Sequence, residues 1–243
     1  MKDWQQRLYD SYVTTGQARF RDDLLHFENP YYDKIITEHL PKQFDLSILD
    51  LACGHGRLIY SLKKHGYRNL LGIDISEEQV AAAHKYGLDE VICQDIKTFV
   101  ENTPGNSYDV IFLIDILEHL EKQEVFDLLD NVNRLLTDKG IVVIHVPNGA
   151  GLFGMRVRYG DFTHQNAFTS NSIRQILQAC HFASINAYED KPTMHGLKSS
   201  VRFVLWQLLT FPLRLLLMAE TGLTKHILSQ NMLVVARKEP AAE

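Results

Sequence analysis

Short apolar runs alternate with longer segments of mixed polarity between Ser47 and Asn148. Such runs are typical of strands buried on both faces, and the longer segments carry the spacing of amphipathic helices. The pattern predicts strands over 47–52, 69–75, 90–96, 108–117 and 140–148, and helices over 57–66, 76–87 and 122–140. Ser76 is the expected N-cap of the second helix, and Gly66 and Gly87 are expected to end the first two. This alternation indicates a doubly wound α/β fold, a mostly parallel sheet with helices on both faces.

The rest of the chain completes this sheet. After a Gly-rich connection, the pattern predicts a helix over 170–179 and strands over 182–189 and 231–238. These strands bring the sheet to seven, and we expect them to form an antiparallel edge, with the last strand antiparallel. Residues 1–45 are expected to form a helical cover over the carboxyl edge of the sheet. Residues 46–243 are expected to form one domain, with an apolar insertion at about 190–228.

Composition excludes several classes of protein. Hydrophobic residues make up 45% of the 243, and 25 Lys and Arg face 30 Asp and Glu, for a net charge of -5. A disordered or collagen-like chain is excluded, and the acidic total argues against a protein that coats nucleic acid. Three scattered cysteines suit neither a disulfide framework nor a CxxC metal site, so we expect a reducing compartment and no metal. The polar N-terminal stretch does not resemble a signal peptide, which predicts a cytoplasmic protein.

The loop after the first predicted strand carries Gly54 and Gly56, where a ligand can approach the backbone at the start of a helix. A plain tight turn explains a lone GxG equally well. A dinucleotide-binding loop would have a third glycine where Ile59 stands, and Asp50, just ahead of the loop, would repel a diphosphate. Asp50 favours a cationic ligand without phosphate, such as S-adenosylmethionine. Asp74 can accept hydrogen bonds from both ribose hydroxyls, or it is a turn acid.

The stretch from Asp50 to His119 resembles class I S-adenosylmethionine-dependent methyltransferases in four motifs, ILDLACGHGRL, GIDIS, CQDI and YDVIFLIDILEHL. The resemblance implies S-adenosylmethionine as the cofactor. It implies contacts to the methionine portion from Asp50, Ala52, Cys53, Gly54 and Gly56, to the ribose from Asp74 and Ile75, to the adenine from Asp95 and Ile96, and to the floor of the site from Ile114 and Asp115. For Cys53, tight packing without a redox role is the alternative.

Two segments supply candidate catalytic residues. Glu118 and His119 follow the fourth predicted strand, near the expected methyl group, and this EH pair resembles that of quinone and small-molecule O-methyltransferases. The loop after the fifth strand carries Asp161, Thr163 and His164 and is expected to overhang the same pocket. A histidine beside a carboxylate can act as the general base for an alcohol, so His164 with Asp161 is the first candidate and His119 the second. Loop-stabilising hydrogen bonds are the alternative role for Asp161 and His164. For Glu118 and His119 the alternative is an acid at a helix start and an exposed histidine.

The YGDFTH segment also resembles a branch of the family associated with cell-surface polysaccharide biosynthesis, which implies a sugar hydroxyl as the methyl acceptor. The alternatives are a prenylated quinol or another lipophilic small molecule, and a cofactor-binding scaffold without catalysis. No NPPY-like tetrapeptide follows the fourth strand, so a nucleic-acid substrate is not expected. Arg156, Arg158 and Arg174 are expected either to bind a phosphate of an activated acceptor or to be solvated loop residues.

An apolar run over 201–218 lies between the last two strands. It is a poor transmembrane helix because five residues interrupt it: Arg202, Gln207, Thr210, Pro212 and Arg214. At about 100° per residue, Gln207, Thr210 and Arg214 share one narrow stripe and leave a broad apolar face. This pattern predicts a helix in the membrane interface, with Lys198 and Arg202 near the headgroups and the protein peripheral to the inner face of the membrane. A buried helix or a dimer contact is the alternative.

Overall fold

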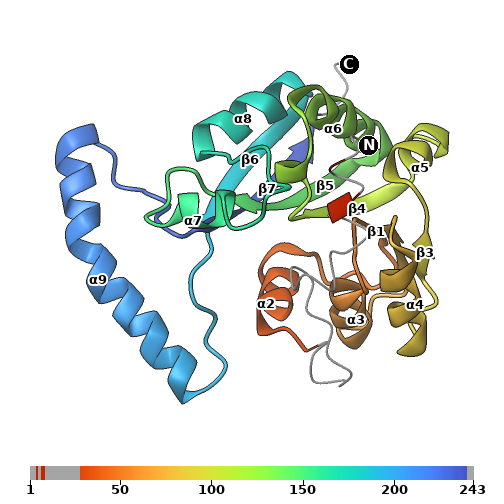
Figure 1. Ribbon diagram of the computed structural model, residues 1–243, viewed down its shortest axis with the longest axis horizontal. Helices are drawn as coiled ribbons and strands as arrows, with labels where there is room; N and C mark the ends of the chain where they lie inside the picture. Colours follow the sequence, from red (N-terminus) through yellow and green to blue (C-terminus); the bar gives the residue numbers. More distant parts are fainter. Residues whose placement is uncertain (1–3, 5–6, 9–27, 240–243) are drawn as a thin grey trace.

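The computed structural model describes residues 28–239 together with Trp4, Arg7 and Leu8 (Figure 1). Most of the predicted N-terminal cover therefore lies outside the described residues. In chain order the elements are α2 (Pro30–His39), β1 (Ser47–Leu51), α3 (Arg57–Lys64), β2 (Asn69–Asp74), α4 (Glu77–Lys85), β3 (Val91–Cys93), α5 (Ile96–Asn102), β4 (Tyr108–Ile114), the 3-10 helix η2 (Leu117–His119), α6 (Lys122–Leu135), β5 (Leu136–Pro147), α7 (Gly154–Arg158), α8 (Ser170–Ala179), β6 (Phe182–Glu189), α9 (Leu197–Thr221) and β7 (Asn231–Lys238).

The strands form one seven-stranded sheet in the order β3-β2-β1-β4-β5-β7-β6. The pairs from β3 to β5 are parallel, and β7 runs antiparallel to both β5 and β6. The predicted α/β sheet with an antiparallel last strand is confirmed. The last two strands form the expected antiparallel edge, in which β7 lies between β5 and β6, and β6 is the edge strand.

Helices cover both faces of the sheet, as the uniformly apolar strands predicted. Successive residues of β1, such as Ile48 and Leu49, point to opposite faces and join separate cores. The Ile48 core is closed by α2, α3 and α4, and the Leu49 core by α5, α6 and α8. Burial on both sides fixes the register of each strand, because a slip of one residue would exchange the two sets of side chains. The sheet therefore holds the loops at its carboxyl edge in fixed positions.

Most element boundaries agree with the pattern. The strands predicted over 90–96 and 108–117 end earlier, at Cys93 and Ile114, and the helix predicted over 122–140 also ends early. Ser76 caps α4 as predicted, since its hydroxyl accepts the Gln79 N–H. The helix predicted over 122–140 ends at Leu135, because residue 136 adopts extended backbone and begins β5. Thr137 donates its hydroxyl proton to Asp109 at 3.0 Å, which ties this segment to β4. The short helices α5 and α7 were not predicted from the pattern.

The long helix α9 stands at one side of the molecule, joined to the sheet by two extended connections (Figure 1). Its buried residues are polar, Ser199 and Thr210. Arg214, on the same side, donates to both carboxylate oxygens of Glu189 at 2.7 Å. Most apolar residues of α9 are exposed, with Leu209 70% accessible, whereas Phe203, Trp206, Leu213 and Leu217 are half-buried. The helix thus turns its polar stripe toward the protein and its apolar face outward, the reverse of an ordinary surface helix.

Candidate active site

The loop between β1 and α3 lies at the carboxyl edge and is built on left-handed backbone. Ala52, Gly54 and Gly56 have φ of 62°, 56° and 81°. A Cβ on Gly56 would lie 2.8 Å from Leu88 Cδ1, so glycine is required there both by backbone and by packing. A Cβ on Gly54 would meet nothing closer than 3.9 Å, so this glycine borders open space at the mouth of the loop.

The Asp74 carboxylate joins this loop to the end of β2. One carboxylate oxygen accepts the Gly54 N–H at 2.8 Å and the other accepts the Ser76 N–H at 2.9 Å. Burial raises the pKa of Asp74, against the opposite effect of these backbone donors. Each oxygen keeps a further lone pair. Asp74 can therefore stabilise the turn and also accept hydrogen bonds from a ribose.

Asp50 is a buried carboxylate beneath the same loop, 2% exposed at the end of β1. Burial, and to a smaller degree the charge of Asp74, raise the pKa of Asp50 well above its usual range. A bound cation would favour its ionised form. Cys53 packs against β2, where a Cβ on Gly72 would lie 2.8 Å from its sulfur, and burial raises the pKa of its thiol. This geometry agrees with the packing alternative for Cys53.

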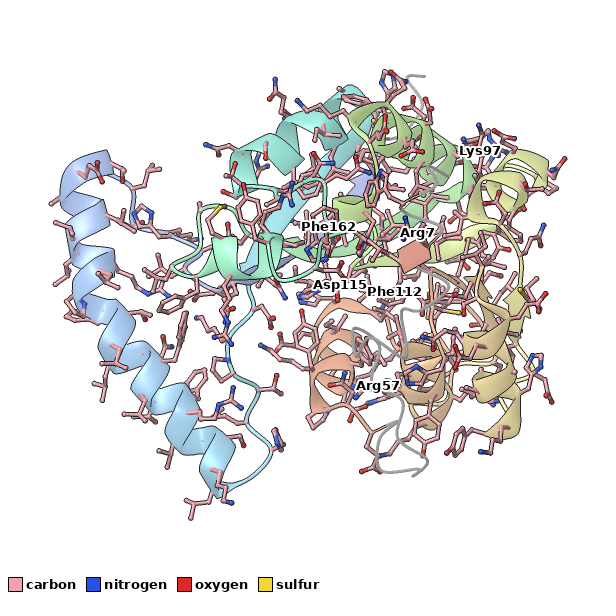
Figure 2. All side chains as sticks on the ribbon, in the orientation of Figure 1. Arg7, Arg57, Lys97, Phe112, Asp115 and Phe162 are labelled. Carbon is pink, nitrogen blue, oxygen red and sulfur yellow. The ribbon has the colours of Figure 1, made fainter. Side chains whose placement is uncertain are left out.

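The remaining predicted cofactor residues follow β2, β3 and β4 at this edge. Ile75 is exposed after β2, and Asp95 caps α5 by accepting the Thr98 N–H at 2.8 Å. Ile96 begins α5, Ile114 ends β4, and Asp115 comes next. Figure 2 labels Asp115 near the middle of the molecule. Because β3, β2, β1 and β4 are neighbours in the sheet, the structure brings all the predicted cofactor residues to one edge.

Asp115, whose side chain is 53% exposed, takes part in a cluster around the buried His145 that the motifs did not reveal. Its carboxylate lies 2.5 Å from Nδ1 of His145, and Nε2 of His145 lies 3.5 Å from the carboxylate of Asp190. Burial opposes a charge on His145, but the two carboxylates outweigh it and raise the pKa of His145 to about 10. The effect of His145 outweighs desolvation of the Asp115 carboxylate and holds the pKa of Asp115 below its usual range. The signal for this cluster was a histidine inside an otherwise apolar strand.

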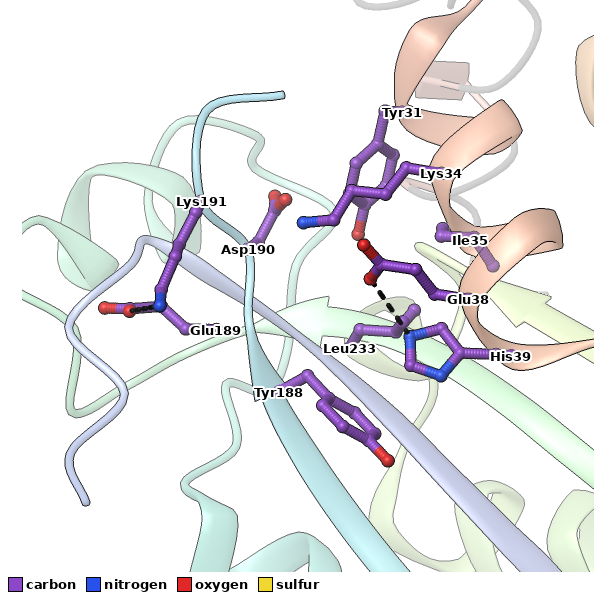
Figure 3. Close-up of a pocket in the computed structure, with 10 residues that line it drawn as sticks. All are labelled: Tyr31, Lys34, Ile35, Glu38, His39, Tyr188, Glu189, Asp190, Lys191 and Leu233. Atoms are coloured by element: carbon purple, nitrogen blue, oxygen red, sulfur yellow. Dashed lines mark ion pairs between the residues drawn. The ribbon is translucent and has the colours of Figure 1, made fainter. Parts of the chain in front are cut away.

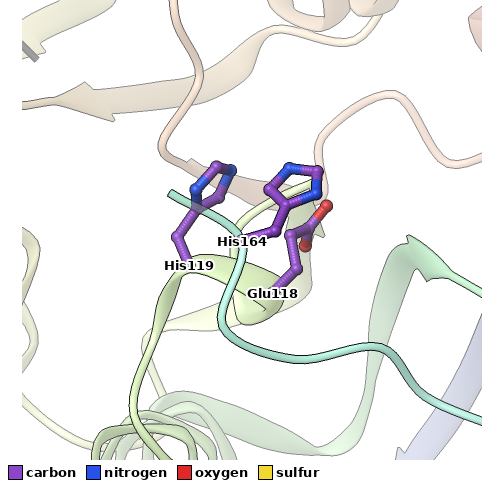
Figure 4. Close-up of side chains that lie close together, drawn as sticks. All are labelled: Glu118, His119 and His164. Carbon is purple, nitrogen blue, oxygen red and sulfur yellow. The ribbon is translucent and has the colours of Figure 1, made fainter. Parts of the chain in front are cut away.

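The candidate catalytic residues meet above η2 (Figure 4). Thr163 donates its hydroxyl proton to Asp161 at 2.6 Å, and the same hydroxyl oxygen lies 2.8 Å from Nδ1 of His119. The structure therefore links Asp161 to His119 through Thr163, whereas the sequence paired this carboxylate with His164. Burial lowers the pKa of His119 to about 4, and the neighbouring His164 adds to this effect. The imidazole of His119 is therefore neutral at physiological pH.

His164 and Glu118 complete this group. The rings of His119 and His164 meet edge to face, with centroids 4.7 Å apart. Nδ1 of His164 lies 3.0 Å from the Val157 carbonyl, which can only accept, so Nδ1 carries the proton. Glu118 is buried, and burial together with Asp115 raises its pKa to about 8. One donor atom from each of Glu118, His119 and His164 lies within 4.8 Å of the others, so these side chains could also hold a metal ion.

The loop that carries His164 is held by hydrogen bonds to main-chain carbonyls. Arg158 donates to the carbonyls of His164 and Gln165. The backbone N–H groups of Gln165 and Asn166 both donate to the carbonyl of Glu118, at 2.6 and 3.0 Å. Arg158 therefore stabilises the loop, a role that differs from both phosphate binding and a solvated position, and the loop is fixed over η2.

A pocket of about 210 Å³ lies between α2 and β6 (Figure 3). Tyr31, Lys34 and His39 line it from α2, and Tyr188 and Asp190 line it from the end of β6. None of these residues was predicted as part of the site. Tyr31 forms the border between this pocket and the His145 cluster, since its ring centroid lies 5.5 Å from that of His145.

Comparison with known proteins identifies the family. A family model described as a methyltransferase domain matches residues 24–186. This chain belongs to the methyltransferase-domain family. Over 131 residues it is 29% identical to a ubiquinone biosynthesis O-methyltransferase of Rickettsia bellii, covering 51% of this chain and 53% of that protein. Over 140 residues it is 31% identical to a putative methyltransferase of Bacillus subtilis, YqeM, covering 55% of each. The chain thus spans about half the length of these curated relatives.

Solved structures share the fold over nearly the whole chain. A SAM-dependent methyltransferase from Archaeoglobus fulgidus has a TM-score of 0.66 at 18% identity, covering 95% of this chain and 99% of that one. The 1,6-didemethyltoxoflavin-N1-methyltransferase of Burkholderia thailandensis, solved with S-adenosylhomocysteine, has a TM-score of 0.59 at 16% identity, covering 97% and 87%. The prediction of a methyltransferase that uses S-adenosylmethionine is confirmed at the level of the family. The predicted polysaccharide branch stays a prediction.

Proposed function

We propose that this protein transfers the methyl group of S-adenosylmethionine to a hydroxyl of a lipophilic small molecule of the prenylated quinol type. The outward apolar face of α9 is the observation that favours a lipophilic acceptor. A water-soluble sugar as the acceptor would not explain so much exposed apolar surface. Several relatives are named ubiquinone biosynthesis O-methyltransferases, which supports the same class. The sugar hydroxyl is the second candidate. It is supported by the YGDFTH segment, and the apolar helix agrees with it where the sugar is lipid-linked.

In this proposal the cofactor lies across the carboxyl edge from β4 to β3. Asp50 faces the cationic end of the cofactor, and the open side of Gly54 admits its methionine portion. Asp74 accepts the ribose hydroxyls with the lone pairs that the backbone leaves, and Asp95 and Ile96 border the adenine. Methyl transfer from a sulfonium needs little more from the protein than alignment of the acceptor oxygen and removal of its proton.

We infer that His119 is the base that takes this proton. The Thr163 hydroxyl donates to Asp161, so it can only accept from His119, and the proton of His119 is therefore on Nδ1. Nε2 then carries the lone pair, and the low pKa keeps it unprotonated. The expected result is a loss of about 100-fold or more in kcat for His119→Asn, within the range of general-base catalysis. His164, first candidate from the sequence, is expected to orient the acceptor, with a smaller loss for His164→Ala.

The apolar face of α9 is proposed to lie in the membrane interface. Among the described residues, α9 is the one helix long and apolar enough to cross a membrane. Two contacts favour an interfacial position over a span: Arg214 binds Glu189 in mid-helix, and Thr210 is buried against the protein. A spanning helix would carry this ion pair into hydrocarbon, whereas an interfacial helix keeps it on the water side. The acceptor would then be drawn from the membrane.

A substrate panel tests the proposal. The purified protein is incubated with methyl-labelled S-adenosylmethionine and, in parallel, with a short-chain prenylated dihydroxybenzene or with nucleotide sugars. Label transfer to the dihydroxybenzene hydroxyl, and loss of transfer in His119→Asn, are the expected results. Transfer only to a sugar would replace the lipophilic acceptor by the second candidate. Absence of transfer to either, with S-adenosylmethionine bound, would favour the non-catalytic scaffold.

A further inference from the structure

We propose that His145 is a positioning residue of the methyl-transfer site: held as an imidazolium between Asp115 and Asp190, it fixes the turn that leads from β4 to the candidate base. The inference builds on the proposed methyl transfer but does not depend on which acceptor is used. His145 comes from β5 and is 5% exposed, and no cofactor motif includes it.

The backbone and the side chain of His145 both hold Asp115. The carbonyl of His145 accepts the Asp115 N–H at 3.1 Å, and Nδ1 of His145 lies 2.5 Å from the Asp115 carboxylate. Asp115 has φ of 52°, in the left-handed region that is strained for a residue with a side chain. Such a conformation persists only where neighbouring contacts enforce it, and both contacts here come from one residue.

The surroundings of the ring determine how many protons it carries. Each ring nitrogen of His145 faces a carboxylate, Nδ1 at 2.5 Å from Asp115 and Nε2 at 3.5 Å from Asp190. A carboxylate can only accept, so a ring that satisfies both carries a proton on each nitrogen and a positive charge. The raised pKa of His145, about 10, agrees with this geometry. The ends of β4 and β6 are thereby joined through the end of β5.

The chain beyond Asp115 connects this contact to the candidate base. The left-handed turn at Asp115 leads into η2, which carries Glu118 and His119. The position of His119 relative to Thr163 is therefore set by the direction in which the chain leaves β4. A relaxed Asp115 would move His119 with respect to the cofactor, and a displacement of about 1 Å at a reacting group can cost about 100-fold in rate. His145 acts through Asp115 and touches neither proposed substrate.

The charged and titratable groups around His145 are acidic or phenolic. Asp115 faces it from the end of β4, Asp190 from the end of β6 and Tyr31 from the start of α2, and Glu118 of η2 acts on it over a longer distance. Removing the Asp190 charge leaves His145 with one close anion, so its proton is then lost at lower pH. That change distinguishes an imidazolium from a neutral ring that only fills space.

The test has two arms. In the first, the ring nitrogens of His145 are followed by 15N NMR against pH in the wild type, in Asp190→Asn and in Glu38→Gln, a control carboxylate of the same pocket that does not contact His145. We expect a doubly protonated ring at pH 7.5, an alkaline midpoint lower by about one pH unit in Asp190→Asn, and no change in Glu38→Gln. A neutral ring at pH 7.5, or identical midpoints in all three proteins, would overturn the proposal.

In the second arm, His145→Asn keeps an N–H donor near Asp115 but removes the charge and the contact to Asp190. With the prenylated dihydroxybenzene as probe, we expect kcat to fall by about 10-fold or more while the Kd for S-adenosylmethionine changes less than about threefold. An unchanged kcat in a folded variant would overturn the proposal. If the wild type does not turn over this probe, the acceptor assignment has failed, and the first arm alone decides on His145.

Discussion

Nδ1 of His119 lies 2.8 Å from the hydroxyl oxygen of Thr163, which in turn donates to Asp161. A hydroxyl has one proton to give, and here it goes to the carboxylate. The orientation of Thr163 therefore decides which nitrogen of His119 is protonated, and leaves Nε2 as the nitrogen that can accept a proton from an acceptor hydroxyl. This relationship makes Thr163 a direct test of the proposed base.

Thr163→Val is expected to lower kcat by about 10- to 100-fold, because His119 loses the group that fixes its tautomer while the shape of the side chain is kept. Thr163→Ser retains the hydroxyl and serves as the matched control, with activity close to wild type. Steady-state kinetics with the prenylated dihydroxybenzene, together with the Kd for S-adenosylmethionine, measure both variants. Equal kcat for Thr163→Val and Thr163→Ser would show that this hydroxyl does not orient the base.

The pKa of Glu118 predicts how stability depends on pH. Glu118 keeps its proton up to about pH 8 in the folded protein, whereas the unfolded chain loses it near 4.5. The folded state therefore binds more protons between these values, and the free energy of unfolding falls as pH rises through this window. Glu118→Gln removes this dependence. From pH 6 to pH 8 the free energy of unfolding of the variant is therefore expected to fall by about 2 kcal/mol less than that of the wild type.

Urea unfolding at the two pH values measures this difference, with Glu78→Gln, an exposed carboxylate in the first turn of α4, as the control. The control is expected to follow the wild type. A parallel fall in stability for wild type and Glu118→Gln would mean that Glu118 is already ionised in the folded protein.

Gly56 gives a packing prediction. Gly56→Ala places a Cβ 2.8 Å from Leu88 in a left-handed backbone, and we expect the free energy of unfolding to fall by about 2 to 4 kcal/mol. Gly87→Ala is matched in backbone, with φ of 74°, but its Cβ would meet nothing within 4 Å, so about 1 kcal/mol is expected. Urea unfolding compares the two. Equal losses would show that crowding contributes nothing at Gly56.

The outward face of α9 predicts binding to membranes. The protein is expected to float with anionic liposomes, and the double variant Leu208→Glu with Leu209→Glu is expected to stay at the bottom, because both leucines are exposed on the apolar face. Phe126→Glu alters an exposed apolar residue on α6 and should float like the wild type. Wild-type protein that stays at the bottom would refute the interfacial position of α9.

The sheet, and the edge at which the proposed cofactor residues meet, could be predicted from the sequence because both depend on local order. Strands such as Ser47–Leu51 are apolar runs, and Gly54, Gly56 and Asp74 lie in short motifs that the parallel strands bring to one edge. The last strand was predicted by its apolar pattern, but its place between β5 and β6 depends on pairing that no single segment encodes.

The arrangement of the candidate catalytic residues could be predicted only in part, because the residues in contact are far apart in the sequence. His119 and Thr163 are 44 residues apart, and His145 and Asp190 are 45 apart. The motifs pointed to Asp161 and His164 as a pair, but the hydroxyl of Thr163 connects the carboxylate to His119 instead. Side-chain partners of this kind are set by the tertiary arrangement of loops, which residue type and spacing do not determine.

Isothermal titration calorimetry of the purified protein with S-adenosylmethionine and with NAD is the decisive experiment on the cofactor. The buried carboxylate of Asp50 ahead of the paired glycines favours a cationic ligand and disfavours a diphosphate. The predicted result is saturable heat with S-adenosylmethionine, weakened at least about tenfold in Asp50→Asn, and no heat with NAD. Saturable heat with NAD and none with S-adenosylmethionine would contradict the assignment of the cofactor and, with it, of methyl transfer.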